Sequence, residues 1–309
     1  MALGLCLGGW SALAQTAPSP VPSQPGQSLK AVTFARGTFV AVGEPGLIAI
    51  SCHDAPWKIR SLGSAGALNA VVCGKDLFIA VGSGGDIFTS TDALQWTARK
   101  SKTKRNLYGI AYGHGEFVAV GAEGTIRTSP DGLHWTASES GTARFLSGVA
   151  YGGGQFVAVG EEGVILTSPD GVRWKGVSAP AKSYHYAVAA RGGTFLIVGD
   201  DILTSSDGLE WKLVQSHLTP RLQAVDSCES LFVGVGGRHV LTSADGEHWL
   251  RQDLPRPGHL EGVTCGNGRF VAVGWQGGDC SILSSPDRGT RQYPAFDGFA
   301  ICDLSRPGG

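Results

Sequence analysis

One short apolar motif occurs seven times along the chain. Residues 39–43 read Phe-Val-Ala-Val-Gly, and close variants recur at residues 78–82, 117–121, 156–160, 195–199, 232–236 and 270–274. Successive copies of the phenylalanine are 39, 39, 39, 39, 37 and 38 residues apart. A period of this length is typical of folds in which each repeat is one supersecondary unit and neighbouring units stack over a shared core. The repeats therefore predict seven equivalent units.

Each unit divides into four short apolar runs separated by turns. In the fourth copy these runs are residues 146–151, 156–160, 164–168 and 174–177. Such runs between glycine-rich turns indicate strands, and no segment keeps a helical apolar period. Glycine makes up 47 of 309 residues, about twice its usual share, as expected for a turn-rich β protein. The sequence predicts an all-β fold, a single seven-bladed β-propeller of four-stranded antiparallel blades. Two smaller propellers would require a break in the phase of the repeat, and there is none.

The first run of every unit has two positions of constant character. Eight residues before the phenylalanine the side chain is always small, as expected where innermost strands crowd around an axis: Ala31, Ala70, Gly109, Gly148, Ala187, Ala224 and Gly262. One position earlier the side chain is polar or amphipathic: Lys30, Asn69, Tyr108, Ser147, Tyr186, Gln223 and Glu261. We expect this second set to surround the mouth of a central channel as a polar funnel.

A second marker, Ser-x-Asp-x3-Trp, follows the apolar motif in five of the units. Serine and aspartate side chains bond to backbone amides a few residues on and so fix a turn, and the tryptophan ring is expected to be buried between blades. In the first unit the acid is displaced to Asp54, and in the last Arg291 replaces the tryptophan. Because a catalytic acid is not needed in so many copies, we predict a structural role for Asp92, Asp131, Asp170, Asp207, Asp245 and Asp287.

These boxes resemble, in shortened form, the repeat of the Asp-box (BNR-like) propellers. That family includes sialidases, certain xyloglucan-cleaving hydrolases and the photosystem II stability/assembly factor-like proteins. The sequence has no Arg-Ile-Pro motif near its start and no arginine triad of the sialidase kind, and it holds only one propeller. The resemblance covers residues 29–293, is greatest to the assembly-factor-like group, and implies a role in protein binding. It bears on fold more than on function.

The remaining residues divide into a leader, a linker and a tail. Residues 1–14 are an uncharged apolar run that ends in Ala-Leu-Ala, as at a signal-peptidase site, although the positive residues that usually precede such a run are missing. We predict a signal peptide at 1–14, a Pro-rich linker at 15–28, the propeller at 29–293, and a tail at 294–309 that packs on blade seven. The protein is then periplasmic or secreted. Six cysteines remain after cleavage, and the sequence does not choose their pairing.

We expect the functional residues to be those that differ from one unit to the next. Arg105, Arg144 and Arg221 precede their phenylalanines by twelve, twelve and eleven residues, so blade geometry brings them to one face. Guanidinium groups bind carboxylates and phosphates through paired hydrogen bonds, which suits an anionic ligand. The segment Tyr184-His185-Tyr186 and Trp275 break the repeat near the same face, and their aromatic rings suit peptide or glycan stacking.

Two other interpretations of this face stay open. Glu123 and Glu162 lie on turns of the same face and can pair with the arginines internally, which would leave a solvated rim. The carboxylate pairs Glu161/Glu162 and Asp200/Asp201 can serve acid–base hydrolysis of a glycan. The candidate ligand-binding residues are Arg105, Arg144, Arg221, Glu123, Glu162, Tyr186 and Trp275.

Charge and motifs narrow the class of function. The formal net charge is −1, unlike that of a nucleic-acid-binding protein, and the leader is too short to span a membrane. There is no nucleophile elbow, zincin motif or P-loop, and the histidines lack metal-ligand spacing. We predict a non-catalytic binding or assembly module, monomeric and without cofactor or metal, whose funnel face takes a protein or an anionic ligand. The alternative is a glycan-binding or glycan-hydrolysing propeller.

Overall fold

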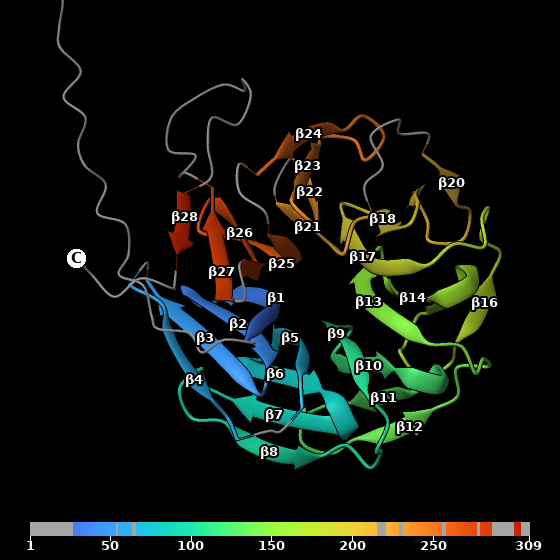
Figure 1. The fold of residues 1–309 in the computed structure, drawn as a ribbon. Helices are drawn as coiled ribbons and strands as arrows, with labels where there is room; N and C mark the ends of the chain where they lie inside the picture. The colour runs from blue at the N-terminus through green and yellow to red at the C-terminus, as the bar shows by residue number, and fades with distance from the viewer. Residues whose placement is uncertain are drawn as a thin grey trace, which may run out of the picture.

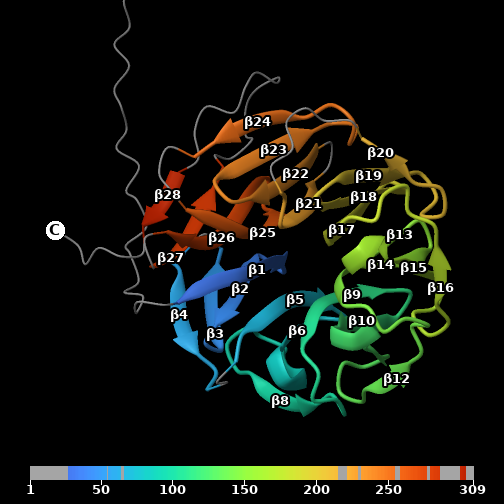
Figure 2. The ribbon, with the colours of Figure 1, turned by 45° about the vertical axis from the view of Figure 1, so that its right-hand side comes forward.

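The computed structural model describes residues 27–303, except for 54, 64–65, 215–220, 229–230, 255–257, 277–278 and 286–299. Seven four-stranded antiparallel sheets stand around a central axis as the blades of a propeller (Figure 1). Each blade takes its strands in sequence order, and the first and last blades are neighbours in the ring (Figure 2). This confirms the predicted fold. Within the described ranges, no helix has the length and apolar character needed to cross a membrane.

The described residues form 28 strands and three short 3-10 turns. Blades one to four comprise β1 (Ser28–Ala35), β2 (Thr38–Glu44), β3 (Leu47–Cys52), β4 (Lys58–Ser61); β5 (Leu68–Gly74), β6 (Leu77–Gly82), η1 (Ser83–Gly85), β7 (Asp86–Ser90), β8 (Thr97–Lys100); β9 (Leu107–Gly113), β10 (Glu116–Gly121), η2 (Ala122–Gly124), β11 (Ile126–Ser129), β12 (Thr136–Ser138); and β13 (Leu146–Gly152), β14 (Gln155–Gly160), η3 (Glu161–Gly163), β15 (Ile165–Ser168), β16 (Lys175–Val177). Blades five to seven comprise β17 (His185–Arg191), β18 (Thr194–Gly199), β19 (Ile202–Ser205), β20 (Lys212–Leu213); β21 (Ala224–Cys228), β22 (Leu231–Gly236), β23 (His239–Ser243), β24 (Leu250–Asp253); and β25 (His259–Gly266), β26 (Arg269–Gln276), β27 (Asp279–Ser284), β28 (Ala300–Asp303).

The two sequence markers face each other across neighbouring strands. The phenylalanine of each second strand pairs with the box serine of the third, as Phe117 does with Ser129 and Phe156 with Ser168. All seven of these phenylalanines are at most 2% exposed. The second strand lies between neighbouring blades and is buried on both sides, so its sequence is a continuous apolar run rather than an alternating one.

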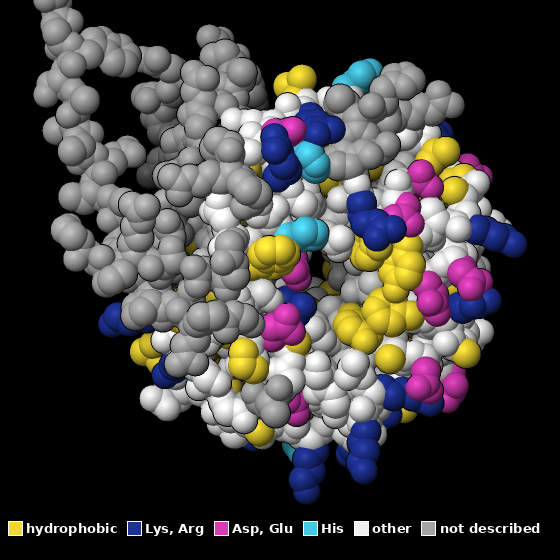
Figure 3. All heavy atoms as spheres, viewed as in Figure 1, with side chains coloured by type: hydrophobic (Ala, Val, Ile, Leu, Met, Phe, Trp, Pro, Cys, Tyr) yellow, Lys and Arg dark blue, Asp and Glu magenta, His cyan; other side chains and the backbone are white. Residues whose placement is uncertain are grey.

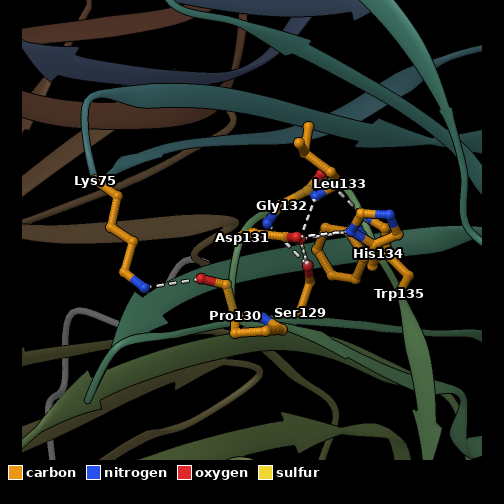
Figure 4. A network of polar contacts seen from close by, with 8 residues as sticks. All are labelled: Lys75, Ser129, Pro130, Asp131, Gly132, Leu133, His134 and Trp135. Carbon is orange, nitrogen blue, oxygen red and sulfur yellow. Dashed lines mark hydrogen bonds and ion pairs between the residues drawn. The ribbon is translucent and has the colours of Figure 1, made fainter.

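The box turn is held by its aspartate, as Figure 4 shows for blade three. One oxygen of Asp131, Oδ1, accepts hydrogen bonds from the backbone amides of Leu133 and His134, both at 2.8 Å, and from the Ser129 hydroxyl at 3.0 Å. The indole of Trp135 is fully buried and donates to the carbonyl of Gly132 at 3.1 Å. The amide contacts recur around Asp92, Asp170, Asp207 and Asp245. Asp54, Asp287 and Arg291 lie outside the described residues.

Neighbouring blades approach so closely that only glycine fits at several positions of the first strands. A Cβ on Gly113, at the end of β9, would lie 2.0 Å from Cγ of Tyr151 in β13. Gly74 meets the ring of Tyr112 at 2.2 Å in the same way. Each tyrosine ring also packs on the phenylalanine of its own blade, with centroids 4.8 Å apart for Tyr151 and Phe156. The glycine is therefore required by the ring that covers it.

The ring closes by packing between blades one and seven, without a shared strand. Blade one consists of β1 to β4 and blade seven of β25 to β28. Leu29 and Phe39 of blade one share a buried cluster with Val273 and Ile282 of blade seven. The outer strand of blade seven, β28, pairs with β27 and comes from the segment assigned to a packed tail in the sequence analysis. The rest of that tail, like the predicted signal peptide, lies outside the described residues.

We expect Gly113→Ala to lower the free energy of unfolding by about 1–3 kcal/mol, because the added methyl group overlaps the Tyr151 ring and forces the blades apart. Urea denaturation measures the change. The control is Gly176→Ala in β16, where a Cβ meets no atom within 4 Å, and a change within about 0.5 kcal/mol is expected. Equal losses in the two variants would contradict the close-packing argument.

We expect Asp131→Ala to cost about 1–3 kcal/mol, because it leaves turn amides without an acceptor, whereas Glu139→Ala in the same blade removes none of these bonds. The His134 ring and the backbone amides hold the pKa of Asp131 well below its usual range. A depressed carboxyl pKa stabilises the fold above about pH 4, and this contribution is lost as the pH falls below that value. Urea midpoints of the wild type and the variant should therefore converge towards pH 3. A difference between the two urea midpoints that stays constant from pH 7 to pH 3 would show that the charge of the Asp131 carboxylate does not contribute to stability.

Candidate functional site

One face of the propeller, here called the funnel face, is formed by the turns between second and third strands and by the chain that enters each first strand. In blades three and four the turns are the 3-10 segments η2 and η3. Their central residues, Glu123 and Glu162, have positive φ values of 52° and 54°. This backbone conformation turns the chain sharply and leaves both glutamate side chains exposed at the rim.

The polar position predicted for the funnel coincides with an irregularity in the first strands. In six blades the strand pairing slips by one residue at this position, as between Leu29 and Ala31 in β1. A bulge of this kind redirects a side chain that regular pleating would place elsewhere. Some of the redirected side chains contact a neighbouring blade: Asn69 donates to the carbonyl of Leu107 at 2.8 Å, and Lys30 of blade one lies 3.6 Å from Glu261 of blade seven.

The three arginines predicted to form an anion site are each paired with a carboxylate. Arg105 Nη2 lies 2.5 Å from Glu123 Oε2, and Arg221 Nε lies 2.8 Å from Asp200 Oδ1. Arg144 pairs with Glu162 in the same manner. All six side chains are between 36% and 64% exposed. The internal pairing left open by the sequence is therefore what the structure shows, and an anionic ligand would have to displace three carboxylates.

A continuous row of aromatic rings lies beside these ion pairs. The ring centroids of Tyr108 and Phe145 are 4.2 Å apart, those of Phe145 and Tyr184 6.0 Å, and those of Tyr184 and Tyr186 4.8 Å. The Arg221 guanidinium lies 5.4 Å from the Tyr186 centroid and ends the row. We call Tyr108, Phe145, Tyr184 and Tyr186 the aromatic row. It crosses blades three, four and five, and all four side chains are partly exposed.

Hydrophobic side chains gather beside the central opening, over β13 and β17, with a basic side chain at their edge (Figure 3). Trp275, in blade seven, is 39% exposed and stacks on His259 with ring centroids 5.8 Å apart. Tyr186 and Trp275 thus lie on the face predicted for them, but in two separate aromatic groups. Lys30 lies within 3.6 Å of both Glu44 and Glu261 at the junction of blades one and seven.

The acidic pairs considered for hydrolysis are engaged in different contacts. Glu161 accepts a hydrogen bond from the backbone amide of Phe145 at 2.8 Å, while its neighbour Glu162 pairs with Arg144. Asp200 pairs with Arg221 and lies 3.3 Å from the amide of Tyr184. Glu161 and Asp200 thus accept hydrogen bonds from the backbone of Phe145 and Tyr184, two residues of the aromatic row. In the ranges that the structure describes, no group of three or more potential ligands is placed to hold a metal ion.

Sequence reasoning missed the contribution of Phe145 and counted Tyr108 only as a member of the polar funnel. A signal was present, because aromatic residues occupy the positions eleven or nine residues before the phenylalanine only in blades three, four and five. These two positions lie on either side of the buried residue that begins the first strand. Side chains from adjacent blades meet there, which the linear sequence does not reveal.

Comparison with known proteins shows the fold. No model of a known family matches the chain, and no curated protein matches it. Among solved structures, YCF48 from Cyanidioschyzon merolae is similar, with a TM-score of 0.65 and 16% identity over 86% of this chain and 97% of that chain. A structure described as YCF48 bound to D1 peptide has a TM-score of 0.66 and 16% identity, over 88% and 98%. The WD40 β-propeller domain of Doa1 has a TM-score of 0.69 and 14% identity, over 87% and 97%.

Proposed function

We propose that this propeller is a binding module that holds an extended segment of a partner protein on its funnel face, across the aromatic row. The observation that carries the proposal is the continuity of the row: four rings from three successive blades form one partly exposed surface beside the channel mouth. Exposed apolar surface of this kind, rimmed by polar groups, is typical of protein-binding sites. The similar propeller YCF48 supports the proposal, since one of its structures is described as bound to D1 peptide.

The charges of the funnel face favour an apolar anchor over an anionic one. The three arginines are neutralised by Glu123, Glu162 and Asp200, so they provide little net positive potential. Exposed pairs of this kind contribute only about 0–1 kcal/mol each, and rim charges of an interface set association rate more than affinity. The rings, in contrast, can be covered completely by a partner, as tyrosines at interface hot spots are. We therefore assign the affinity to the aromatic row and orientation to the paired arginines.

A glycan is a second candidate ligand, favoured by the exposed Trp275. Its ring is the largest exposed aromatic surface in the described residues and stacks on His259, as a platform for a sugar ring would. This group lies in blade seven, separate from the aromatic row in blades three to five. If Trp275→Ala abolishes ligand binding and Tyr184→Ala does not, the result would favour the glycan over the peptide as the ligand.

The proposed binding is tested by photo-crosslinking. A benzophenone amino acid at Phe145 should attach reproducibly to one segment of a cellular protein, which mass spectrometry identifies, while the same group at Leu133, on the box turns at the other end of the blades, should not. The segment is then synthesised and titrated. We expect Tyr184→Ala with Tyr186→Ala to weaken binding at least tenfold, corresponding to about 1.4 kcal/mol.

The matched control for that titration is Arg105→Ala with Arg144→Ala, which removes two ion pairs and leaves the rings. We expect it to change affinity less than threefold and to reduce the association rate. Loss of binding in this control, with the tyrosine variant unaffected, would show that the arginines rather than the rings form the site.

We also propose that the protein is exported. The apolar segment 1–14 with its Ala-Leu-Ala end supports this, as does the disulfide bond of Cys265, because disulfides persist in oxidising compartments. The test fuses residues 1–28 to alkaline phosphatase, which is active only after export. An inactive fusion that accumulates in full-length form would contradict export.

A further inference from the structure

One buried position beneath the aromatic row departs from the repeat. Ten residues before the phenylalanine, six units carry a leucine that is at most 1% exposed: Leu29, Leu68, Leu107, Leu146, Leu222 and Leu260. Blade five carries His185 at this position, and its exposed fraction is 0%. An imidazole in a leucine site is costly, because burial removes its hydration. The six leucines show what packing alone favours here.

The chain around His185 is tied to blade four. The Ser183 carbonyl accepts a hydrogen bond from the amide of Gly163 in η3 at 2.8 Å, and the Ser147 hydroxyl of β13 donates to the carbonyl of His185. The ring nitrogen Nε2 lies 3.4 Å from the Ser183 hydroxyl. These contacts hold the backbone of 183–185 against the neighbouring blade.

In sequence, His185 lies between the two residues whose rings stack on each other in the aromatic row. Tyr184 and Tyr186 have ring centroids 4.8 Å apart and an interplanar angle of 24°. The bulge between His185 and Ala187 turns Tyr186 out to the funnel face, while His185 points inward. The buried His185 side chain thus anchors the chain segment that carries both stacked rings.

Burial lowers the pKa of His185, while a hydrogen bond to the backbone of Val164 and the nearby Asp201 and Asp200 carboxylates oppose the shift. The ring is consequently neutral at pH 7. The charged groups around this segment are Asp200 and Asp201 on the turn between β18 and β19, Arg221, which pairs with Asp200, and Glu161 in η3, which acts on Tyr184. Burial outweighs the groups that favour the charged ring, so the buried site holds an imidazolium less well than a neutral ring.

We propose that His185 is a positioning residue that makes the aromatic row sensitive to acid: the neutral ring keeps Tyr184 and Tyr186 stacked, and its protonation opens the segment 183–187. That this opening releases a partner rests on the proposed function, whereas the opening itself does not. The six leucine-bearing blades lack the titrating group and stay closed.

Hydrogen exchange followed by mass spectrometry tests the opening on the whole protein, without a partner. After correction for the intrinsic pH dependence of exchange, the opening constant of the segment 183–187 should rise from pH 7.5 to pH 5.5, by at most about tenfold, because the imidazole binds a proton more readily in the open form, where its pKa is about 6.5. The equivalent segment of blade two, 66–70, contains Leu68 and provides an internal control that should not change. In His185→Leu, which restores the repeat residue, neither segment should respond to pH. His185→Gln, which cannot titrate either, repeats the test if the leucine variant folds poorly.

The thermal midpoint gives an independent readout. It should fall from pH 7.5 to pH 5.5 by a larger amount in the wild type than in His185→Leu, because the unfolded imidazole binds a proton that the folded one resists. Equal opening of 183–187 at both pH values in the wild type, or acid opening retained in His185→Leu, would overturn the proposal. Acid opening without any crosslinked partner at Phe145 would leave the positioning role intact and contradict only the binding function.

Discussion

Close approach of the innermost strands is the constraint on which the rest of this structure depends. A Cβ on Gly109 would lie 3.1 Å from the Cα of Gly148 in the next blade, and one on Gly262 would lie 2.8 Å from the Cα of Ala31 across the ring closure. Seven twisted sheets can meet around an axis only if the facing residues are small. Because the same spacing is needed at each junction, each unit has an alanine or a glycine at the same distance from its phenylalanine, and the ring closes without exchanging a strand.

The fold was predictable because each unit carries its own copy of the strand and turn pattern. In the first four units the phenylalanine and the box serine are twelve residues apart, because they are partners across two strands, as Phe117 and Ser129 are. A period visible in sequence thus corresponds to a contact in space. The aromatic row has no such period: Tyr108 and Phe145 come from different units, 37 residues apart in sequence, and meet only because blades three and four are adjacent. Contacts between blades are fixed by the angle at which sheets pack, which a single sequence does not specify.

Ion pairing changes the meaning of the arginines that the repeat brings to one face. Arg105 and Arg144 were predicted to converge, and they do share the funnel face, but Glu123 and Glu162 occupy their guanidinium groups. Both glutamates are placed by the positive φ of a turn that follows the second strand. The turn that ends each second strand therefore places the glutamate that neutralises the arginine preceding the first strand of the same blade. The aromatic row remains as the feature of this face that a partner can bury.

A repeat protein supplies its own controls, because six copies show what a position requires for packing alone. Departure from the repeat is not by itself a sign of function. Ala93 adopts a φ of 60° where four other boxes have glycine, yet it is fully buried in the core between blades, so its role ends with packing. His185 is equally buried, but in sequence it lies between two residues whose side chains reach the funnel face, and its ring also lies 3.4 Å from the Ser183 hydroxyl, a contact that leucine cannot make. A buried ionisable ring directly beneath an exposed aromatic surface can act on that surface, and this separates the two departures on physical grounds.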